Sequence, residues 1–171
     1  MLQERTGTQR PGGGVRVGFG HDAHRLEPGR ALVLGGVRIP YERGLTGHSD
    51  ADVVLHALTD AILGAAAAGD IGQLFPPTDP TYRDADSRFF LRRAAECVRE
   101  RGLQIVSVDA TLVAQAPRVA PYVPQMRAAI AETLQIELAR VSVKATTTEG
   151  MGYTGSGEGM AAYAVATLSE R

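Results

Sequence analysis

Segments with the twofold periodicity of strands alternate along this chain with segments of helical periodicity, and this order constrains the fold more than any other feature. The alternation predicts strands at about 15–24, 31–34, 37–39, 103–114, 141–146 and 160–168. Amphipathic helices are expected between them, over about 49–64, 87–102 and 123–134. We therefore expect a two-layer α/β fold, in which about three helices cover one face of a mixed sheet of about four long strands.

The last predicted strand indicates what covers the other face of the sheet. Ala162, Ala164 and Ala166 share one side of it, and Tyr163 and Val165 share the opposite side. Because neither side is polar enough for full exposure to water, we expect the second face to be buried where the sheets of several copies pack together.

Two short sequence signals predict a hairpin turn and the start of the first helix. The glycine pair 35–36, between two short apolar runs, predicts a tight hairpin. Ser49 is the expected N-cap of the first helix, with Asp50 and Asp52 in its first turn, where the helix dipole favours anions.

Length and composition limit the classes of protein that the chain can represent. With 171 residues, 44% hydrophobic and 22% charged, it suits one domain at 15–171, preceded by a polar, glycine-rich leader at 1–14 that we expect to be disordered. Eighteen Lys and Arg balance 19 Asp and Glu, so no basic field draws nucleic acid or an anionic membrane. One cysteine excludes an intrachain disulfide framework, and the absence of a long apolar run predicts a cytoplasmic protein.

All four histidines, His21, His24, His48 and His56, lie in the first third of the chain, close to carboxylates. Asp22 and His24 are two apart on a strand, so they project to the same side, whereas His21 is expected to point away and not to bind metal. Two histidines and one carboxylate suit a zinc ion with an open fourth position, and Asp22, His24 and His56 are the candidates. A structural histidine in a helix and a turn at a strand end would give the same spacing, which leaves both interpretations open.

A second group of polar residues, Lys144 to Glu149, follows a predicted strand and precedes the glycine-rich stretch 150–159. Threonine hydroxyls and loop amides donate to phosphate oxygens, and a nearby Glu is a suitable ligand for Mg²⁺ or Mn²⁺. In segment 69–76, Asp70 offers an acceptor for a polyol hydroxyl. In segment 114–118, small residues expose backbone groups that could bind the edge of a base. Taken singly, an exposed strand and ordinary turns explain each of these segments equally well or better.

Taken together, these segments resemble the 2-C-methyl-D-erythritol 2,4-cyclodiphosphate synthases of the non-mevalonate isoprenoid pathway. The resemblance runs from about residue 15 to the end, and so many ordered matches are more specific than any single motif. The matching stretches are Asp22 to His24, Gly36 to Pro40, His48 to Asp52, Leu55 to Ala61, Gly69 to Pro76, Ala114 to Pro117, Lys144 to Glu149 and Gly155 to Gly159.

The resemblance implies a lyase that acts on 4-diphosphocytidyl-2-C-methyl-D-erythritol 2-phosphate. The 2-phosphate of this substrate attacks its own β-phosphorus, expels CMP and leaves a cyclic diphosphate. The resemblance also implies a homotrimer with active sites between subunits, a zinc ion, and a second divalent ion, Mg²⁺ or Mn²⁺, on the diphosphate.

The resemblance assigns roles to individual residues of this chain. Asp22, His24 and His56 would bind zinc facing the substrate, while His48 and Thr147 would stabilise the transition state and Ser49 would hold phosphate. Asp60, one helical turn beyond His56, would orient that ring or accept a substrate hydroxyl, and we favour the orienting role. The remaining expected substrate contacts are Asp70, Ile71, Gly72, Phe75, Pro76, Pro77, Thr78 and Asp79 around the methylerythritol and phosphate, Ala114, Gln115, Ala116, Pro117, Arg118, Val119 and Ala120 around cytosine, and Thr146, Thr147, Thr148 and Glu149 over the diphosphate.

Glu149 would lie near the second metal, and Tyr153 would pack near the phosphates or serve plain packing. Ser156 is also an expected substrate contact, but it stands where many relatives carry an arginine, which removes a cation from the centre of the expected trimer. The alternatives to the lyase are a zinc-dependent phosphate ester hydrolase with Asp60 as base and a non-catalytic nucleotide-binding trimer.

Overall fold

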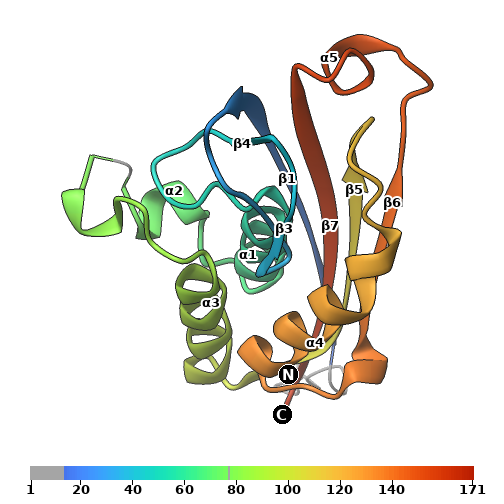
Figure 1. Cartoon of the computed structure of the whole chain (residues 1–171). Helices are drawn as coiled ribbons and strands as arrows, with labels where there is room; N and C mark the ends of the chain where they lie inside the picture. Colours follow the sequence, from blue (N-terminus) through green and yellow to red (C-terminus); the bar gives the residue numbers. More distant parts are fainter. Residues whose placement is uncertain (1–13, 77) are drawn as a thin grey trace, which may run out of the picture.

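The computed structural model describes residues 14–76 and 78–171, so the predicted leader, apart from Gly14, and the expected substrate contact Pro77 lie outside the described residues. One mixed sheet runs in the order β4-β1-β7-β5-β6 (Figure 1), with β5 and β6 parallel and the other pairs antiparallel. Its strands are β1 (Val15–Pro28), β4 (Arg43–Leu45), β5 (Leu103–Val113), β6 (Val141–Thr146) and β7 (Gly159–Glu170). The predicted α/β class is confirmed, but the sheet has five strands instead of about four, because the three residues of β4 are too few to show a periodicity.

The three predicted helices are present as α1 (Val53–Ala65), α3 (Arg88–Glu100) and α4 (Val123–Leu134), and they pack on one face of the sheet (Figure 1). Shorter elements are α2 (Ile71–Leu74), α5 (Gly152–Gly155) and the 3₁₀ turns Pro80–Tyr82, Ala120–Tyr122 and Leu138–Arg140. Within the described residues, no helix combines the length and the apolar character that crossing a membrane requires. A cytoplasmic location stays a prediction.

Helix α1 lies unusually close to β1. A Cβ atom at Gly18 would come within 2.0 Å of the Ala61 carbonyl oxygen, and one at Gly20 within 2.0 Å of the Ala57 carbonyl oxygen. Any larger residue at either position would therefore push the helix away. This close contact places His56, the neighbour of Ala57, over the next residues of β1 on the same side.

The start of α1 differs from the sequence expectation. Asp52, not Ser49, is the N-cap, and its carboxylate accepts from the amides of Val54 and Leu55 at 3.1 Å each. The same carboxylate also accepts from the amides of Gly35 and Gly36, at 2.9 and 2.7 Å. Asp50 lies outside the helix, since its carboxylate binds Ser87 instead.

Asp52 thereby ties the helix to the predicted hairpin, which forms from β2 (Leu32–Leu34) and β3 (Val37–Ile39). Both hairpin glycines have positive φ angles, 59° and 76°, as a tight two-residue turn requires. Burial and the nearby Asp50 carboxylate raise the pKa of the fully buried Asp52 to about 6, against the four amide donors that favour its charged form.

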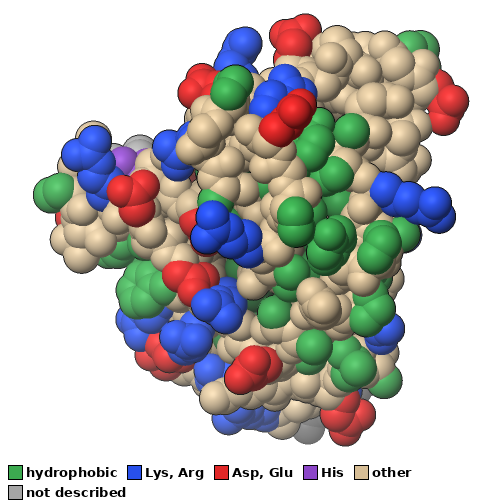
Figure 2. Space-filling view, in the orientation of Figure 1, with side chains coloured by type: hydrophobic (Ala, Val, Ile, Leu, Met, Phe, Trp, Pro, Cys, Tyr) green, Lys and Arg blue, Asp and Glu red, His purple; other side chains and the backbone are tan. Residues whose placement is uncertain are grey.

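The second face of the sheet carries large apolar side chains that no other part of the described chain covers. Val17 and Phe19 of β1 are 65% and 64% exposed, and Tyr163 and Val165 project from the same face of the neighbouring β7. By contrast, Ala162 and its alternating neighbours on the helix face are buried. On the surface seen in Figure 2, Lys and Arg side chains lie among Asp and Glu side chains, as the balanced composition predicts.

Candidate metal and substrate site

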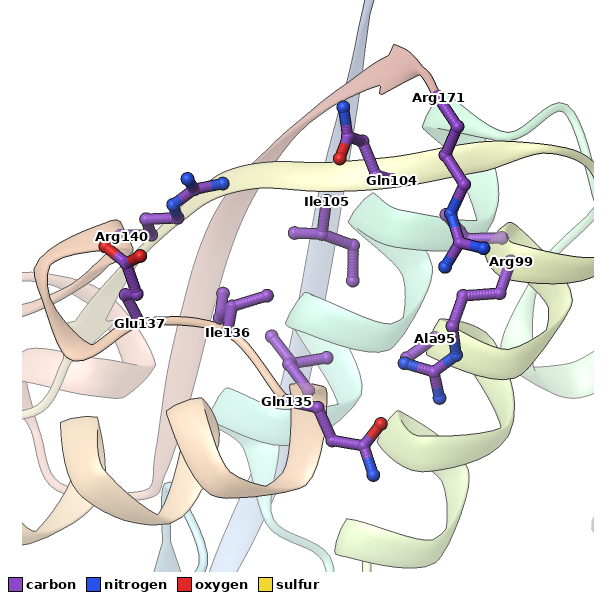
Figure 3. Close-up of a pocket in the computed structure, with 11 residues that line it drawn as sticks. Ala95, Arg99, Gln104, Ile105, Gln135, Ile136, Glu137, Arg140 and Arg171 are labelled. Atoms are coloured by element: carbon purple, nitrogen blue, oxygen red, sulfur yellow. The ribbon is translucent and has the colours of Figure 1, made fainter.

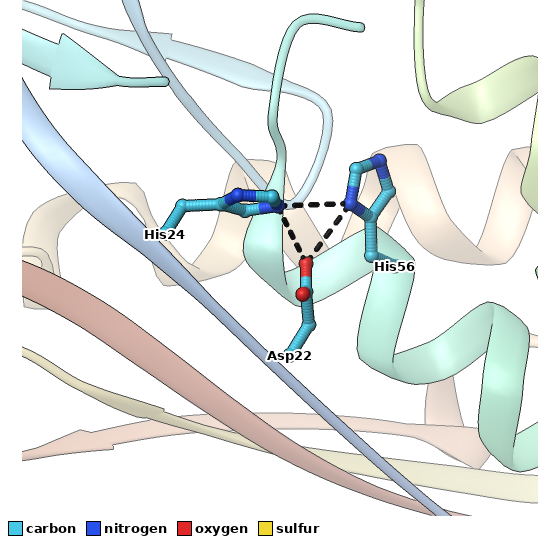
Figure 4. Close-up of side chains that lie close together, drawn as sticks. All are labelled: Asp22, His24 and His56. Carbon is cyan, nitrogen blue, oxygen red and sulfur yellow. Dashed lines mark hydrogen bonds and ion pairs between the residues drawn. The ribbon is translucent and has the colours of Figure 1, made fainter. Parts of the chain in front are cut away.

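Asp22, His24 and His56 converge at the point where α1 crosses β1 (Figure 4). The Oδ2 atom of Asp22 lies 2.8 Å from His24 Nε2 and 2.9 Å from His56 Nδ1, and these two ring nitrogens are 3.2 Å apart. Asp22 and His24 alternate with residues of the opposite sheet face, and His56 reaches them from the helix. The predicted zinc ligands are thus brought together.

The charges of this group favour an ionised carboxylate between two imidazoles. Burial opposes ionisation of Asp22, but hydrogen bonds from His24 and His56 outweigh it and hold the pKa of Asp22 well below its usual range. Burial likewise opposes protonation of His56, but its hydrogen bond to Asp22 and the nearby carboxylate charges raise the pKa of His56 above its ordinary value.

The donor set fits a divalent cation. At the usual zinc–ligand distance, the ligand atoms of a tetrahedral site lie about 3.3 Å apart, close to the 2.8, 2.9 and 3.2 Å separations found here. If both ring nitrogens donate to Asp22 Oδ2, the 3.2 Å contact between them joins two donors and has no acceptor. A cation that all three can ligate matches this set better than a hydrogen-bond network does.

The second ring nitrogen of His56 is held by two serines and not by Asp60. His56 Nε2 lies 2.9 Å from Ser87 Oγ and 3.1 Å from Ser49 Oγ. Asp60 Oδ1 instead accepts from the Ile71 amide at 2.7 Å, which anchors the loop after α1. The orienting role that we favoured for Asp60 is therefore wrong, because the turn into α2 takes its carboxylate away from the ring.

A cavity of about 250 Å³ opens beside the three candidate ligands. It brings together the predicted residues Asp22, His24, His48, Ser49, His56, Ile71, Gly72 and Phe75. Tyr82 and Phe90 also line it, and the sequence analysis missed both as site residues. Their rings pack with Phe75, at centroid distances of 5.6 and 4.9 Å, and so form an apolar wall beside the ligands.

Other predicted contacts around this cavity serve the loop itself. His48 Nε2 lies 3.0 Å from the Asp79 carbonyl oxygen. The Asp79 carboxylate caps the 3₁₀ turn through Thr81, and that bond lowers its pKa. Asp70 caps α2 through the amide of Gln73, at 2.8 Å, and Pro76 and Thr78 lie in the loop that follows.

The second predicted group lies at the other edge of the sheet. A separate cavity of about 250 Å³ is lined by Ala114, Gln115, Pro117, Arg118, Val119, Ala120, Ala145, Thr146 and Thr147, next to Ala116. β7 and β5 lie between β1 and β6, so three strand spacings, about 14 Å in all, separate these two strands across the sheet. Within one chain the structure does not bring Thr147 to His48.

The loop after β6 is largely exposed. Thr147 Oγ1 donates to Glu149 Oε1 at 2.9 Å, and Thr148 Oγ1 lies 3.0 Å from Thr154 Oγ1. Tyr153 lines two hollows, one beside Thr148 and Tyr163 and one beside His24 and Glu158. Ser156 ends α5 and donates to the Tyr153 carbonyl oxygen and to Glu158.

The sequence was compared with protein families and with known proteins. A sequence model of the YgbB family matches residues 15–169. The chain belongs to this family. It is 59% identical to the 2-C-methyl-D-erythritol 2,4-cyclodiphosphate synthase of Moorella thermoacetica, over 92% of this chain and 96% of that protein. The resemblance inferred from the sequence is confirmed.

Two solved structures extend the comparison to the fold of this YgbB-family chain. The bifunctional IspDF from Campylobacter jejuni superposes with a TM-score of 0.91 at 42% identity, over 94% of this chain and 44% of that one. A CDP-bound 2C-methyl-D-erythritol-2,4-cyclodiphosphate synthase superposes with a TM-score of 0.82 at 38% identity, over 90% and 99%.

A further cavity of this family member, about 280 Å³ in volume, lies between the ends of α3 and α4 (Figure 3). Arg99, Arg140 and Arg171 line it together with Gln104 and Gln135. Glu137 adds a single carboxylate, but three guanidinium groups repel a cation and no histidine or cysteine lines the cavity, so it lacks the donor set of a zinc centre. The cavity beside Asp22 remains the candidate site.

His21 lies on the opposite face of β1 from the candidate ligands. Its ring stacks on Tyr163, with centroids 4.7 Å apart, and its Nδ1 atom is 3.1 Å from the Ala162 carbonyl oxygen. This placement follows the alternation of side chains along a strand.

Proposed function

We propose that this chain converts 4-diphosphocytidyl-2-C-methyl-D-erythritol 2-phosphate to 2-C-methyl-D-erythritol 2,4-cyclodiphosphate with release of CMP. The observation that carries the proposal is the convergence of Asp22, His24 and His56 beside a cavity, in a chain 59% identical to a named synthase. In the reaction, an oxygen of the 2-phosphate forms a bond to the β-phosphorus, and the bond from that phosphorus to the CMP oxygen breaks.

The cavity residues suit a reaction that needs positioning more than acid–base chemistry. The attacking phosphate is already ionised and tethered to its target, so the protein supplies no nucleophile and no general base. Ser49, at the cavity, offers a hydroxyl donor to phosphate oxygens, and His48 would offer its ring N–H on releasing the Asp79 carbonyl oxygen. The ring wall of Phe75, Tyr82 and Phe90 excludes water from one side.

Asp22, His24 and His56 would hold Zn²⁺, and Glu149 would contribute to a site for Mg²⁺ or Mn²⁺ shared with the substrate diphosphate. A bound divalent cation supplies electrostatic stabilisation of the negative charge that builds on the transferred phosphoryl group. The protein would fix the position of the zinc ion, because Ser87 and Ser49 hold the far side of the His56 ring.

A homotrimer accounts for the division of the site between two edges of the sheet. The exposed apolar face of β1 and β7 provides a surface on which three sheets can pack. In such an assembly, Thr147 and the cavity lined by Ala114 to Ala120 of one copy, where cytosine would bind, would face His48 of the next. Each active site would then combine both groups, and Thr147 would reach the reacting phosphate.

Incubation of the purified chain with the cytidyl substrate and Mg²⁺ or Mn²⁺ tests the proposal. We expect CMP and the cyclic diphosphate to form in equal amounts, which ³¹P NMR of the reaction mixture measures. A linear phosphate product and activity on simple phosphate esters would point to the hydrolase instead. One oxygen of the Asp60 carboxylate accepts from the Ile71 amide, so the hydrolase would need the other oxygen to act as the base. Nucleotide binding without any product would contradict both.

A further inference from the structure

The hydrogen-bond directions around His56 follow from its Nδ1 atom. That atom faces Asp22 and His24, at 2.9 and 3.2 Å, and is therefore the atom available to a cation. A neutral imidazole that presents a lone pair at Nδ1 carries its hydrogen at Nε2. The Nε2–H group must then find an acceptor on the far side of the ring.

Ser87 provides this acceptor, and Asp50 determines its orientation. Ser87 Oγ lies 2.9 Å from His56 Nε2 and donates its own hydrogen to Asp50 Oδ1. The Ser87 amide donates to Asp50 Oδ2 at 3.1 Å, so the carboxylate grips the serine at two atoms. Because an ionised carboxylate only accepts, the lone pairs of Ser87 Oγ are left for the ring N–H.

Ser87 gives up the role that its position would predict. It is the N-cap residue of α3, yet its hydroxyl makes no capping hydrogen bond. Asp86 instead accepts from the first amide of the helix, at Arg88, over 2.9 Å. Ser87 is also fully buried, so its hydroxyl is turned into the protein toward the ring instead of toward its own helix.

Ser49 is the second hydroxyl near Nε2, but its surroundings differ. It lies at 3.1 Å and lines the cavity beside the candidate ligands, whereas Ser87 does not. Its Oγ also accepts from the Ala51 amide at 3.2 Å. The hydrogen of Ser49 can therefore be donated to Ser87 Oγ, 3.5 Å away, or to a ligand in the cavity.

We infer that Ser87 and Asp50 are positioning residues that hold His56 with Nδ1 directed at the cation, an inference that rests on the proposed zinc site. The series His56, Ser87, Asp50 fixes the tautomer and the rotation of the ring and directs a negative charge toward it. Partners of this kind change metal affinity about 10- to 100-fold when they are removed.

Zinc affinity of the metal-free full-length chain, measured by competition with a chromophoric chelator, tests the inference without reference to turnover. For Ser87→Ala we expect about 10- to 100-fold weaker zinc binding, because Nε2–H loses its nearer acceptor and the link to Asp50, and keeps only Ser49 Oγ. Thr133→Val is the matched control: it also removes a buried hydroxyl, one that donates to the Ala129 carbonyl oxygen at 2.7 Å in the remote helix α4.

Asp50→Asn tests the other end of the series while Ser87 stays in place. We expect a smaller loss of zinc affinity, because the amide keeps one acceptor oxygen but carries no charge. If Ser87→Ala and Thr133→Val bind zinc as tightly as the unmodified chain, the inference is overturned. If the unmodified chain itself binds no zinc, the proposed metal site fails instead, so the two failures are distinguishable.

Discussion

The two groups of proposed site residues differ in how firmly one chain holds them. Around His56, each ring nitrogen has a buried or half-buried partner, and the backbone beneath is fixed by the close contact of α1 with β1. Thr147 and Glu149 are exposed and bond chiefly to each other. One chain thus preforms the cation half of the site, whereas under the proposed trimer Thr147 and Glu149 would acquire their surroundings from another copy.

Removal of a ligand from the firm half should have the largest effect. His56→Ala takes away one of three ligand atoms, so we expect zinc content to be lost and turnover to fall by more than about a thousandfold. The oligomeric state should be unchanged, because His56 does not lie on the exposed sheet face. Metal analysis together with the CMP-release assay measures both, and retained zinc with normal turnover would refute the ligand assignment.

Thr147→Ala in the open half should lower turnover by about a hundredfold and leave zinc content unchanged, because the residue would donate to the transition state without binding the metal. Mixing this variant with His56→Ala tests whether the site is shared. When equal amounts assemble together at random, about one interface in four joins two intact halves. We therefore expect the co-refolded mixture to regain about a quarter of the original activity; no recovery would mean that each chain works alone.

Disruption of the proposed contact between copies should separate the two halves. Phe19→Asp places a charge on the apolar sheet face, so we expect assembled chains to dissociate and turnover to fall at least about tenfold at micromolar concentration. Zinc binding should persist, since the ligands come from one chain. Analytical ultracentrifugation measures the mass of the assembly. Arg92→Ala, on the exposed side of α3, is the control and should leave that mass unchanged. An unchanged mass for Phe19→Asp would contradict a contact through this face.

Long elements with a clear periodicity were predictable from the sequence, but side-chain contacts between residues distant in the sequence were not. Helix α4 begins and ends where its apolar spacing predicts, at Val123 and Leu134. The start of α1 was misplaced because Ser49, Asp50 and Asp52 are all suitable caps by type. Which of them caps depends on distant partners: Gly35 and Gly36 hold Asp52, while Ser87 holds Asp50.

The same reasoning explains what the site analysis found and missed. The Asp22–His24 spacing on a strand puts both ligands on one side, and the structure places His56 beside them. Ser87 gave the signal of an ordinary helix cap, so its contact with His56, 31 positions away, could not be read from spacing. Thr147 and His48 were assigned to one site, but their separation across the sheet became visible only with the strand order.

The smallest expected effect concerns pH and sharpens the contrast between the halves. In the metal-free chain, the Asp22 carboxylate raises the pKa of His56, so a proton and zinc compete for Nδ1. Lowering the pH through that pKa protonates His56 and weakens zinc binding, by about tenfold per pH unit while one proton is displaced. The pKa of Asp22 lies far below this window, so its carboxylate stays charged and adds no slope.

Chelator competition between pH 8 and about pH 5.5 measures the effect of pH on zinc affinity. His21→Ala and Thr147→Ala should both keep the slope, because neither residue contacts the ligands, and a flat profile would mean that zinc does not displace this proton.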